Sequence, residues 1–331
     1  MANKQYAMGI DVGGTKILAG IIETSSGKVL GTARKRTRPE RGVDFFKERL
    51  VTVAQGALDA AALPKGAALS AIGIGVAGQV DRANGVLLAA PNLSAGLDHL
   101  PLGELLEDRF HLPVALGNDV EVATLGEQVY GAARGCDDFV CVFVGTGIGS
   151  GIVEGGQLYR GATGTAGEIG HTVVQYNGRL CGCGGRGHLE AYASRTAITR
   201  ILLAELARGR TSKLRDLIDL ADPQIRSKVI ARCLDDQDAL VTEAVSDAAD
   251  YLGAGLGSLV TFYNPKRIVL GGGLIEAAPL LFERASLRTR EVALPGPGRQ
   301  VEIVRTALGD NSGIVGAAYM GARQASPPGA K

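Results

Sequence analysis

Two glycine-rich turns carry residue types suited to binding phosphate. Residues 6–12 read as a strand that runs into Gly13-Gly14-Thr15-Lys16, and residues 139–144 as a strand that runs into the glycine-rich stretch 145–151. Glycine lets backbone N–H groups come close to a ligand, and rings of such groups bind phosphate oxygens. Neither turn fits the Walker A pattern. Two such turns facing each other on two domains could hold a polyphosphate, although each could also be an ordinary tight hairpin.

Histidine and cysteine gather in one stretch of the second half. His171 is followed by Cys181, Cys183 and His188. These are ligand types that zinc prefers, and four of them make a closed tetrahedral structural site. A disulfide across one residue would be strained. The set predicts one structural zinc bound by all four side chains, the alternative being a glycine-rich loop with incidental cysteines.

A third glycine pattern imitates a dinucleotide-binding fingerprint. Residues 73–78 fit G-x-G-x-x-G after a strand, and Asp98 follows at a suitable distance. The fingerprint needs a helix that begins inside the glycine run. Here Asn84-Gly85, which predicts a hairpin between Val80 and Val86, and Pro91 break any helical period, so we do not expect nicotinamide binding.

Several polar side chains stand at the ends of elements, beside glycines. Carboxylates and amides in such places suit recognition of a polyhydroxylated ligand, and loops on a scaffold carry many functional sites. Each alone could equally be a cap or turn residue, and Asn118-Asp119 is a reasonable helix start. The set comprises Asn92, Asn118, Asp119, Glu168, His171 and Glu190.

The elements that must position these residues alternate along the chain. Mixed strands and helices in both halves argue an α/β fold. Expected strands cover residues 7–32, 70–78, 113–117, 139–153, 266–270 and 301–304. Expected helices cover residues 43–62, 102–110, 118–133, 189–208, 237–263 and 311–324, and we expect the last to pack back on the first domain.

Composition narrows the class of protein. The 331 residues suffice for two domains of ordinary size, and 46% hydrophobic residues support sizeable cores. A net charge of +1 leaves no footprint for nucleic acid or an acidic membrane, so we expect neither as a partner. No apolar run reaches the ~18 residues of a transmembrane helix. An odd cysteine count, without a signal-peptide pattern, favours a reducing cytoplasm.

Eight stretches of the sequence together resemble the ROK family (repressors, open-reading-frame proteins and sugar kinases), most closely its bacterial glucokinases. They follow the family's order over most of the chain. The stretches are residues 9–16, 73–81, 90–93, 117–120, 125–127, 145–151, 167–171 and 181–184.

The resemblance implies an α/β, actin-like (ribonuclease H-like) ATPase fold of two lobes around a cleft. The implied lobes are residues 1–120 with 307–331, and residues 121–306. The family is commonly dimeric or tetrameric, so we expect a homodimer or homotetramer. A departure from the family is His188, which stands where the family usually has a third cysteine. We also expect no N-terminal helix-turn-helix segment, because the first turn begins within fifteen residues of Met1.

The resemblance also assigns roles to individual residues. It implies that Asp119 is the catalytic base and that Asp11 lies near Mg²⁺. The implied ATP-binding residues are Asp11, Gly13, Gly14, Thr15, Lys16, Gly145, Thr146, Gly147, Gly271, Gly272 and Gly273. The implied sugar-binding residues are Gly78, Asn92, Asn118, Asp119, Glu168, His171 and Glu190.

The sequence therefore predicts ATP-dependent phosphorylation of a hexose, with glucose as the expected acceptor. Within the kinase class, N-acetylglucosamine, N-acetylmannosamine, mannose and fructose stay open as acceptors. A catalytically silent sugar sensor and an oxidoreductase are the alternatives from other classes.

Overall fold

The computed structural model describes residues 5–90, 93, 96–219 and 223–325, and the chain divides into two compact units. The first unit comprises Met1–Gly135 and Asp310–Lys331, and the second Cys136–Gly309. The predicted boundary at residue 120 falls in the first turn of a helix that the first unit contains whole.

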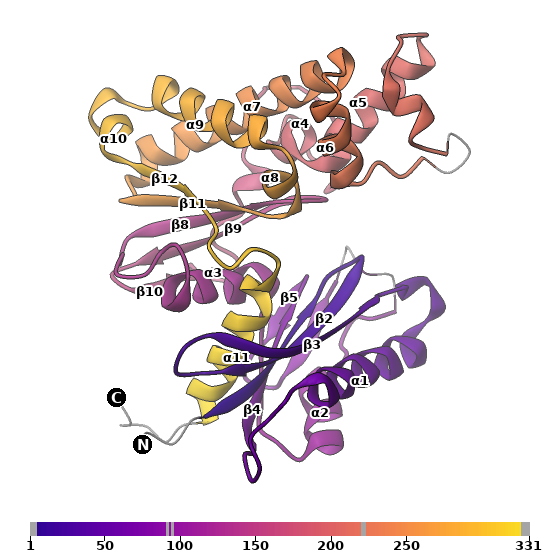
Figure 1. The fold of residues 1–331 in the computed structure, drawn as a ribbon. Coiled ribbons are helices and arrows are strands. Elements are labelled where there is room, and N and C mark those ends of the chain that lie inside the picture. The colour runs from indigo at the N-terminus through magenta and orange to yellow at the C-terminus, as the bar shows by residue number, and fades with distance from the viewer. Residues whose placement is uncertain (1–4, 91–92, 94–95, 220–222, 326–331) are drawn as a thin grey trace. The chain divides into compact units, whose positions relative to one another are not determined.

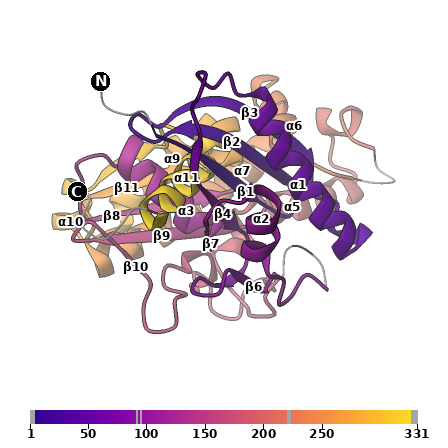
Figure 2. The same cartoon turned by 90° about the horizontal axis from the view of Figure 1, so that it is seen from below.

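The first unit is a five-stranded sheet with helices on both faces (Figure 1). Its strands are β1 (Tyr6–Val12), β2 (Lys16–Glu23), β3 (Lys28–Arg36), β4 (Leu69–Val76) and β7 (Val114–Asn118), with the hairpin β5 (Gln79–Asp81) and β6 (Val86–Ala89) beside it. Its helices are α1 (Val43–Ala60), α2 (Leu102–Phe110), α3 (Asp119–Tyr130) and α11 (Ser312–Ala325). Figure 2 shows α1 alongside β2 and β3, against which it packs.

Strand β1 separates the two helical layers by its alternation of side chains. Met8, Ile10 and Val12 lie in the core that α1 closes. Successive side chains of a strand point to opposite faces, so Gly9 and Asp11 face α11. A Cβ at Gly9 would stand 1.7 Å from the carbonyl oxygen of Ile314. The backbone of α11 thus rests directly on the sheet, which confirms the predicted return of this helix to the first domain.

The second unit carries a second five-stranded sheet under a layer of helices. Its strands are β8 (Phe139–Val144), β9 (Ile148–Glu154), β10 (Gln157–Tyr159), β11 (Arg267–Gly271) and β12 (Glu302–Arg305). Its helices are α4 (Glu190–Ala193), α5 (Arg195–Ala207), α6 (Ser227–Asp235), α7 (Ala239–Tyr263), α8 (Gly273–Ala277), α9 (Pro279–Val292) and α10 (Pro295–Gln300). No helix among the described residues is both long enough and apolar enough to cross a membrane.

One predicted helix of the second unit is interrupted. Residues 189–208 form two helices, α4 and α5, because Ser194 between them is extended at φ −77° and ψ 161°. The Ser194 hydroxyl accepts a hydrogen bond from the amide of Ala197 at 3.1 Å. Serine offers the backbone this local alternative to continuing a helix. The break lets a new helix N-terminus begin at Arg195.

The two sheets share one topology. The strand order is β3-β2-β1-β4-β7 in the first and β10-β9-β8-β11-β12 in the second. In each, the first three strands pair antiparallel and the last two are added parallel. This duplication confirms the predicted α/β, actin-like fold. The first glycine turn joins β1 to β2, and the second joins β8 to β9 at the equivalent place in the other sheet.

Candidate active site and metal centre

The first glycine turn, between β1 and β2, is held by hydrogen bonds from Thr37, which directly follows β3. Gly13 donates its N–H to the Lys16 carbonyl at 3.0 Å. The fully buried Thr37 donates its hydroxyl to the Gly13 carbonyl at 2.6 Å and its N–H to the Thr15 carbonyl at 3.1 Å. Within the described residues, the N–H groups of Gly14 and Thr15 have no hydrogen-bond partner. Two donors of this turn are therefore available to an anion.

Three carboxylates and one ammonium group gather beside this turn. Asp11 is the penultimate residue of β1, Asp119 begins α3, and Asp310 precedes α11. The Lys16 ammonium donates to Asp310 Oδ1 at 3.0 Å. Burial, and secondarily the charge of Asp119, raise the pKa of Asp11 to about 7, against the opposing effect of Lys16. The close approach of α11 contributes to this burial, because a Cβ at Gly313 would stand 3.0 Å from Asp11 Cγ.

The start of α3 is held by Asn118. The Asn118 side-chain oxygen accepts from the amides of Val120 at 2.9 Å and Glu121 at 3.3 Å, which makes it the N-cap. Its side-chain amide donates to the Gly78 carbonyl at 3.1 Å. Asp119 is therefore the first helical residue, and the predicted helix start is confirmed with the capping role on Asn118. Capping leaves the carboxylate of Asp119 at the positive end of the helix.

A guanidinium also anchors α3. Arg82, directly after β5, donates to both carboxylate oxygens of Glu121 at 2.6 Å. This pair ties the β5–β6 hairpin to the first turn of α3, which carries Asp119. No local sequence pattern predicts this ion pair, because the two residues are 39 positions apart.

The second glycine turn, between β8 and β9, is bonded to two helices of its own unit. Glu190, at the start of α4, accepts the Ile148 N–H on Oε2 at 2.9 Å. Arg195, at the start of α5, donates its N–H to the Gly145 carbonyl at 2.9 Å and its Nη2 to Thr146 Oγ1 at 2.6 Å. Sequence reasoning missed Arg195, because only the helix break at Ser194 brings it to the turn.

The third glycine group lies beside this second turn. Gly271 ends β11, and Gly273 begins α8. Gly272 has φ +93°, and a Cβ there would stand 2.5 Å from the Val144 carbonyl oxygen. Glycine is thus required where β11 passes the end of β8. The hydroxyl of Ser227, the first residue of α6, is buried near Gly273 and has no hydrogen-bond partner among the residues that the structure describes.

The four predicted metal ligands form one cluster in the second unit. Their ligand atoms all lie within 4.8 Å of one another. Cys181 Sγ is 3.8 Å from His171 Nδ1, and Cys183 Sγ is 3.2 Å from His188 Nδ1. All four thiol and imidazole groups suit zinc, whose tetrahedral bonds of ~2.0–2.3 Å would space the ligand atoms by roughly 3.3–3.8 Å. Both cysteines are free of disulfides, so the side chains present fit the metal.

Tight turns hold this cluster together. Cys181 donates its N–H to the Gly185 carbonyl at 2.8 Å, and Gly184, at φ +89°, donates to the Cys181 carbonyl at 3.0 Å. A Cβ at Gly185 would stand 2.3 Å from the His188 ring. The glycines of this loop are therefore needed for the imidazole and thiol groups to converge.

Glu190 connects the metal cluster to the second glycine turn. Glu168 precedes the first cluster residue, His171, by three positions in the chain. Besides Ile148, Glu190 approaches Cys181 Sγ with Oε1 at 3.8 Å. Glu168 is exposed and precedes the 3₁₀ turn Ile169–His171, to which it contributes its carbonyl. Asn92, another predicted sugar ligand, lies outside the described residues.

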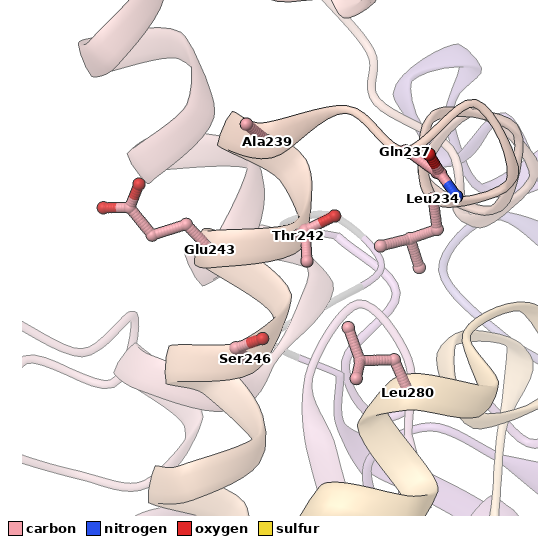
Figure 3. A pocket seen from close by; sticks show the side chains of 7 residues that line it. All are labelled: Leu234, Gln237, Ala239, Thr242, Glu243, Ser246 and Leu280. Carbon is pink, nitrogen blue, oxygen red and sulfur yellow. The ribbon is translucent and has the colours of Figure 1, made fainter.

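One hollow of the second unit lies away from all of these residues. It has a volume of about 610 Å³ and lies at the start of α7, with lining from α6 and α9. Figure 3 shows Leu234 and Leu280 on one side of it and Thr242 on the other. It contains none of the predicted ATP, sugar or metal ligands, so it adds nothing to the candidate site.

The duplicated sheet and its glycine turns define a protein of the actin-like ATPase fold. The model of the ROK family matches residues 7–324. The glucokinase of Streptomyces coelicolor is 33% identical over 325 residues, which are 97% of this chain and 98% of that protein. A putative xylose repressor of Caldicellulosiruptor sp. is 30% identical over 320 residues, 96% of this chain and 78% of the repressor.

A solved structure agrees with these relatives. The crystal structure of a ROK family glucokinase from Streptomyces griseus, in complex with glucose and AMPPNP, matches with a TM-score of 0.83 and 34% identity over 96% of this chain and 99% of that one. The chain belongs to the ROK family.

Proposed function

We propose that the protein is an ATP-dependent hexose kinase and that glucose is its preferred acceptor. The observation that carries the proposal is the group beside the first glycine turn, where Asp11, Asp119 and Lys16 meet. The available N–H donors of this turn can bind a nucleotide phosphate, and a carboxylate beside the turn can accept a proton. The glucose and AMPPNP bound by the Streptomyces griseus glucokinase support this assignment of ligands.

The proposed reaction is in-line transfer of the γ-phosphoryl group to the sugar 6-hydroxyl. Such transition states are loose, so positioning and charge neutralisation provide most of the catalysis. Asp119 accepts the hydroxyl proton and orients the oxygen towards phosphorus. Lys16 and the N–H groups of both turns hold the phosphates. Asp11 would hold Mg²⁺, which neutralises phosphate charge when bound.

Sugar recognition is assigned to polar groups of both units. Hydroxyl-pairing groups of this kind discriminate strongly against sugars that leave them unpaired. In the first unit, Asn118 is already fixed by its cap and by Gly78, which suits an oriented contact. The proposed sugar-binding residues are Gly78, Asn92, Asn118, Asp119, Glu168, His171 and Glu190.

The metal cluster is proposed to hold one structural zinc ion. His171, Cys181, Cys183 and His188 would bind it, and it would supply a fixed loop rather than chemistry. Glu190 is adjacent to Cys181, so the loop also sets the position of this proposed sugar ligand. His188 stands where the family usually has cysteine, and it would still serve as the fourth ligand, because imidazole also binds zinc.

A non-catalytic sugar sensor is the second candidate. Similarity to a putative xylose repressor favours it. The presence of Asp119 and of both glycine turns favours the kinase. Kinases of mannose, fructose, N-acetylglucosamine or N-acetylmannosamine are the alternatives within the enzyme class.

A coupled ADP-release assay over a hexose panel tests the proposal, with sugar phosphates identified directly by mass spectrometry. We expect glucose to give the highest kcat/KM, with mannose and glucosamine weaker. The panel is repeated with polyphosphate as donor. An N-acetylated hexosamine above glucose would change the substrate, whereas sugar binding without any sugar phosphate would favour the sensor.

Assembly and location in the cell are also part of the proposal. We expect a homodimer or homotetramer in the cytoplasm. Light scattering on the purified protein measures the assembly, and a monomer at the working concentration would contradict it.

A further inference from the structure

Arg195 places a positive charge on the second glycine turn. Its backbone N–H is bonded to the Gly145 carbonyl at 2.9 Å, and its Nη2 to the Thr146 hydroxyl at 2.6 Å. Within the part of the chain that the structure describes, no carboxylate forms an ion pair with its guanidinium. Lys16, on the first turn, differs in this respect because Asp310 neutralises it.

Arg195 is half-buried, and this partial burial makes its charge costly. Desolvation lowers the pKa of Arg195 below its ordinary value, although the guanidinium stays charged at neutral pH. A hydroxyl partner satisfies one N–H donor and does not compensate the charge. An anion at the turn would do so through charge-assisted hydrogen bonds.

The turn itself has room and donors for an anion. Gly145 donates its N–H to the Gly147 carbonyl at 2.9 Å, and Ile148 donates to Glu190. Among the described residues, nothing accepts the N–H groups of Thr146 and Gly147. A Cβ at Gly145 would meet no atom of the described residues within 4 Å, so this side of the turn has room for a ligand.

We propose that Arg195 is a phosphoryl-binding residue, whose guanidinium joins the Thr146 and Gly147 N–H groups in one anion site for the terminal phosphates of the nucleotide. The inference rests on the proposed kinase function and deepens it. Thr146 holds the guanidinium against the turn. Thr196 in turn fixes Thr146, by donating its hydroxyl to the Thr146 carbonyl at 2.7 Å.

The carboxylate of Glu190 gives the guanidinium a further role. Glu190 Oε2 would stand 2.4 Å from a Cβ at Gly147, so a negative charge lies beside the same turn. This carboxylate would repel a phosphate that approaches the turn. Arg195, on the neighbouring helix, offsets that repulsion while Glu190 keeps the Ile148 N–H in place.

A purely structural clamp is the competing explanation, and nucleotides of different charge separate the two. The binding constants of ATP, ADP, AMP and adenosine are measured by calorimetry on the full chain. The variants are Arg195→Met, which keeps the stem, and Arg195→Lys, which keeps the charge. Arg200→Met, an exposed arginine of the same helix, is the matched control.

We expect Arg195→Met to weaken ATP and ADP binding about 10- to 100-fold, since one charge-assisted contact is lost. Binding of AMP and adenosine should change less than about 2-fold, Arg195→Lys should lie between, and Arg200→Met should match the wild type. If the wild type phosphorylates a hexose, two results would overturn this inference alone. One is an equal loss of ATP and adenosine binding in Arg195→Met, and the other is unchanged ATP binding in that variant. If Arg195→Met does not fold, Arg195→Lys provides the test. An equal weakening of ATP and adenosine binding in Arg195→Lys would likewise contradict the inference. A wild type that binds no nucleotide would overturn both this inference and the proposed function.

Discussion

Asp11 makes stability depend on pH in a direction opposite to that of most carboxylates. Its pKa rises from 3.8 to about 7 in the folded chain, chiefly by burial. Between these values the folded state keeps a proton that the unfolded state has lost. The free energy of unfolding therefore falls as pH rises from about 4 to about 7, and is flat above that range. The stabilising effect is fully present at low pH and lost as pH passes the folded pKa.

The magnitude follows from the size of the shift. The difference of 3.2 pKa units (7 − 3.8) corresponds to about 4 kcal/mol at most, at 1.36 kcal/mol per unit. Asp11→Asn removes the titrating group and keeps the shape of the side chain. We expect the variant to be more stable than the wild type at pH 8, by up to about 4 kcal/mol, and to show no such advantage at pH 4.

Thermal unfolding over pH 4–8, in a chelator and without nucleotide, measures this difference. The Tm of Asp11→Asn minus that of the wild type should increase with pH through this range. Asp108→Asn is the control, since Asp108 is exposed in the same unit and should give a constant difference. A pH-independent difference for Asp11→Asn would refute the argument that burial of this carboxylate is costly.

Three other substitutions test separate parts of the molecule. Asp119→Asn should lower kcat by about 10²–10⁴-fold with little change in the glucose Kd from calorimetry, because it cannot act as a base; since Asn118 is the cap, near-wild-type kcat would remove the assignment of the base. Cys181→Ser should lower bound zinc, Tm and sugar affinity together, because the proposed zinc ion would stabilise the loop; full activity in wild-type protein shown by metal analysis to contain no zinc would contradict this proposal. Gly73→Ala should destabilise by about 3 kcal/mol or more in denaturant unfolding, because its Cβ would stand 1.7 Å from the Ala317 oxygen; Gly296→Ala, where a Cβ meets nothing within 4 Å, should be nearly neutral, and equal losses would argue against the close packing of α11.

Local sequence patterns were sufficient for most elements and for the membership of the metal cluster. Apolar periodicity predicted α1 at 43–62 against the observed Val43–Ala60, and Asn84-Gly85 predicted the hairpin of β5 and β6. Both depend on residues close together in the chain. The same local reasoning joined α4 and α5 into one helix, because it gave no weight to the hydrogen bond that Ser194 makes to Ala197.

The sequence by itself determined the two strand–turn–strand units, the membership of the candidate metal cluster and the helix start at Asn118, because neighbouring residues specify glycine turns and caps. Only the tertiary structure decided which side chains meet at those turns. Lys16 pairs with Asp310 across 294 positions, and Thr37 supports Gly13 across 24. Arg195 reaches Thr146 across 49. Such contacts depend on how helices pack on the sheets, and a local pattern of residues contains no information about that packing.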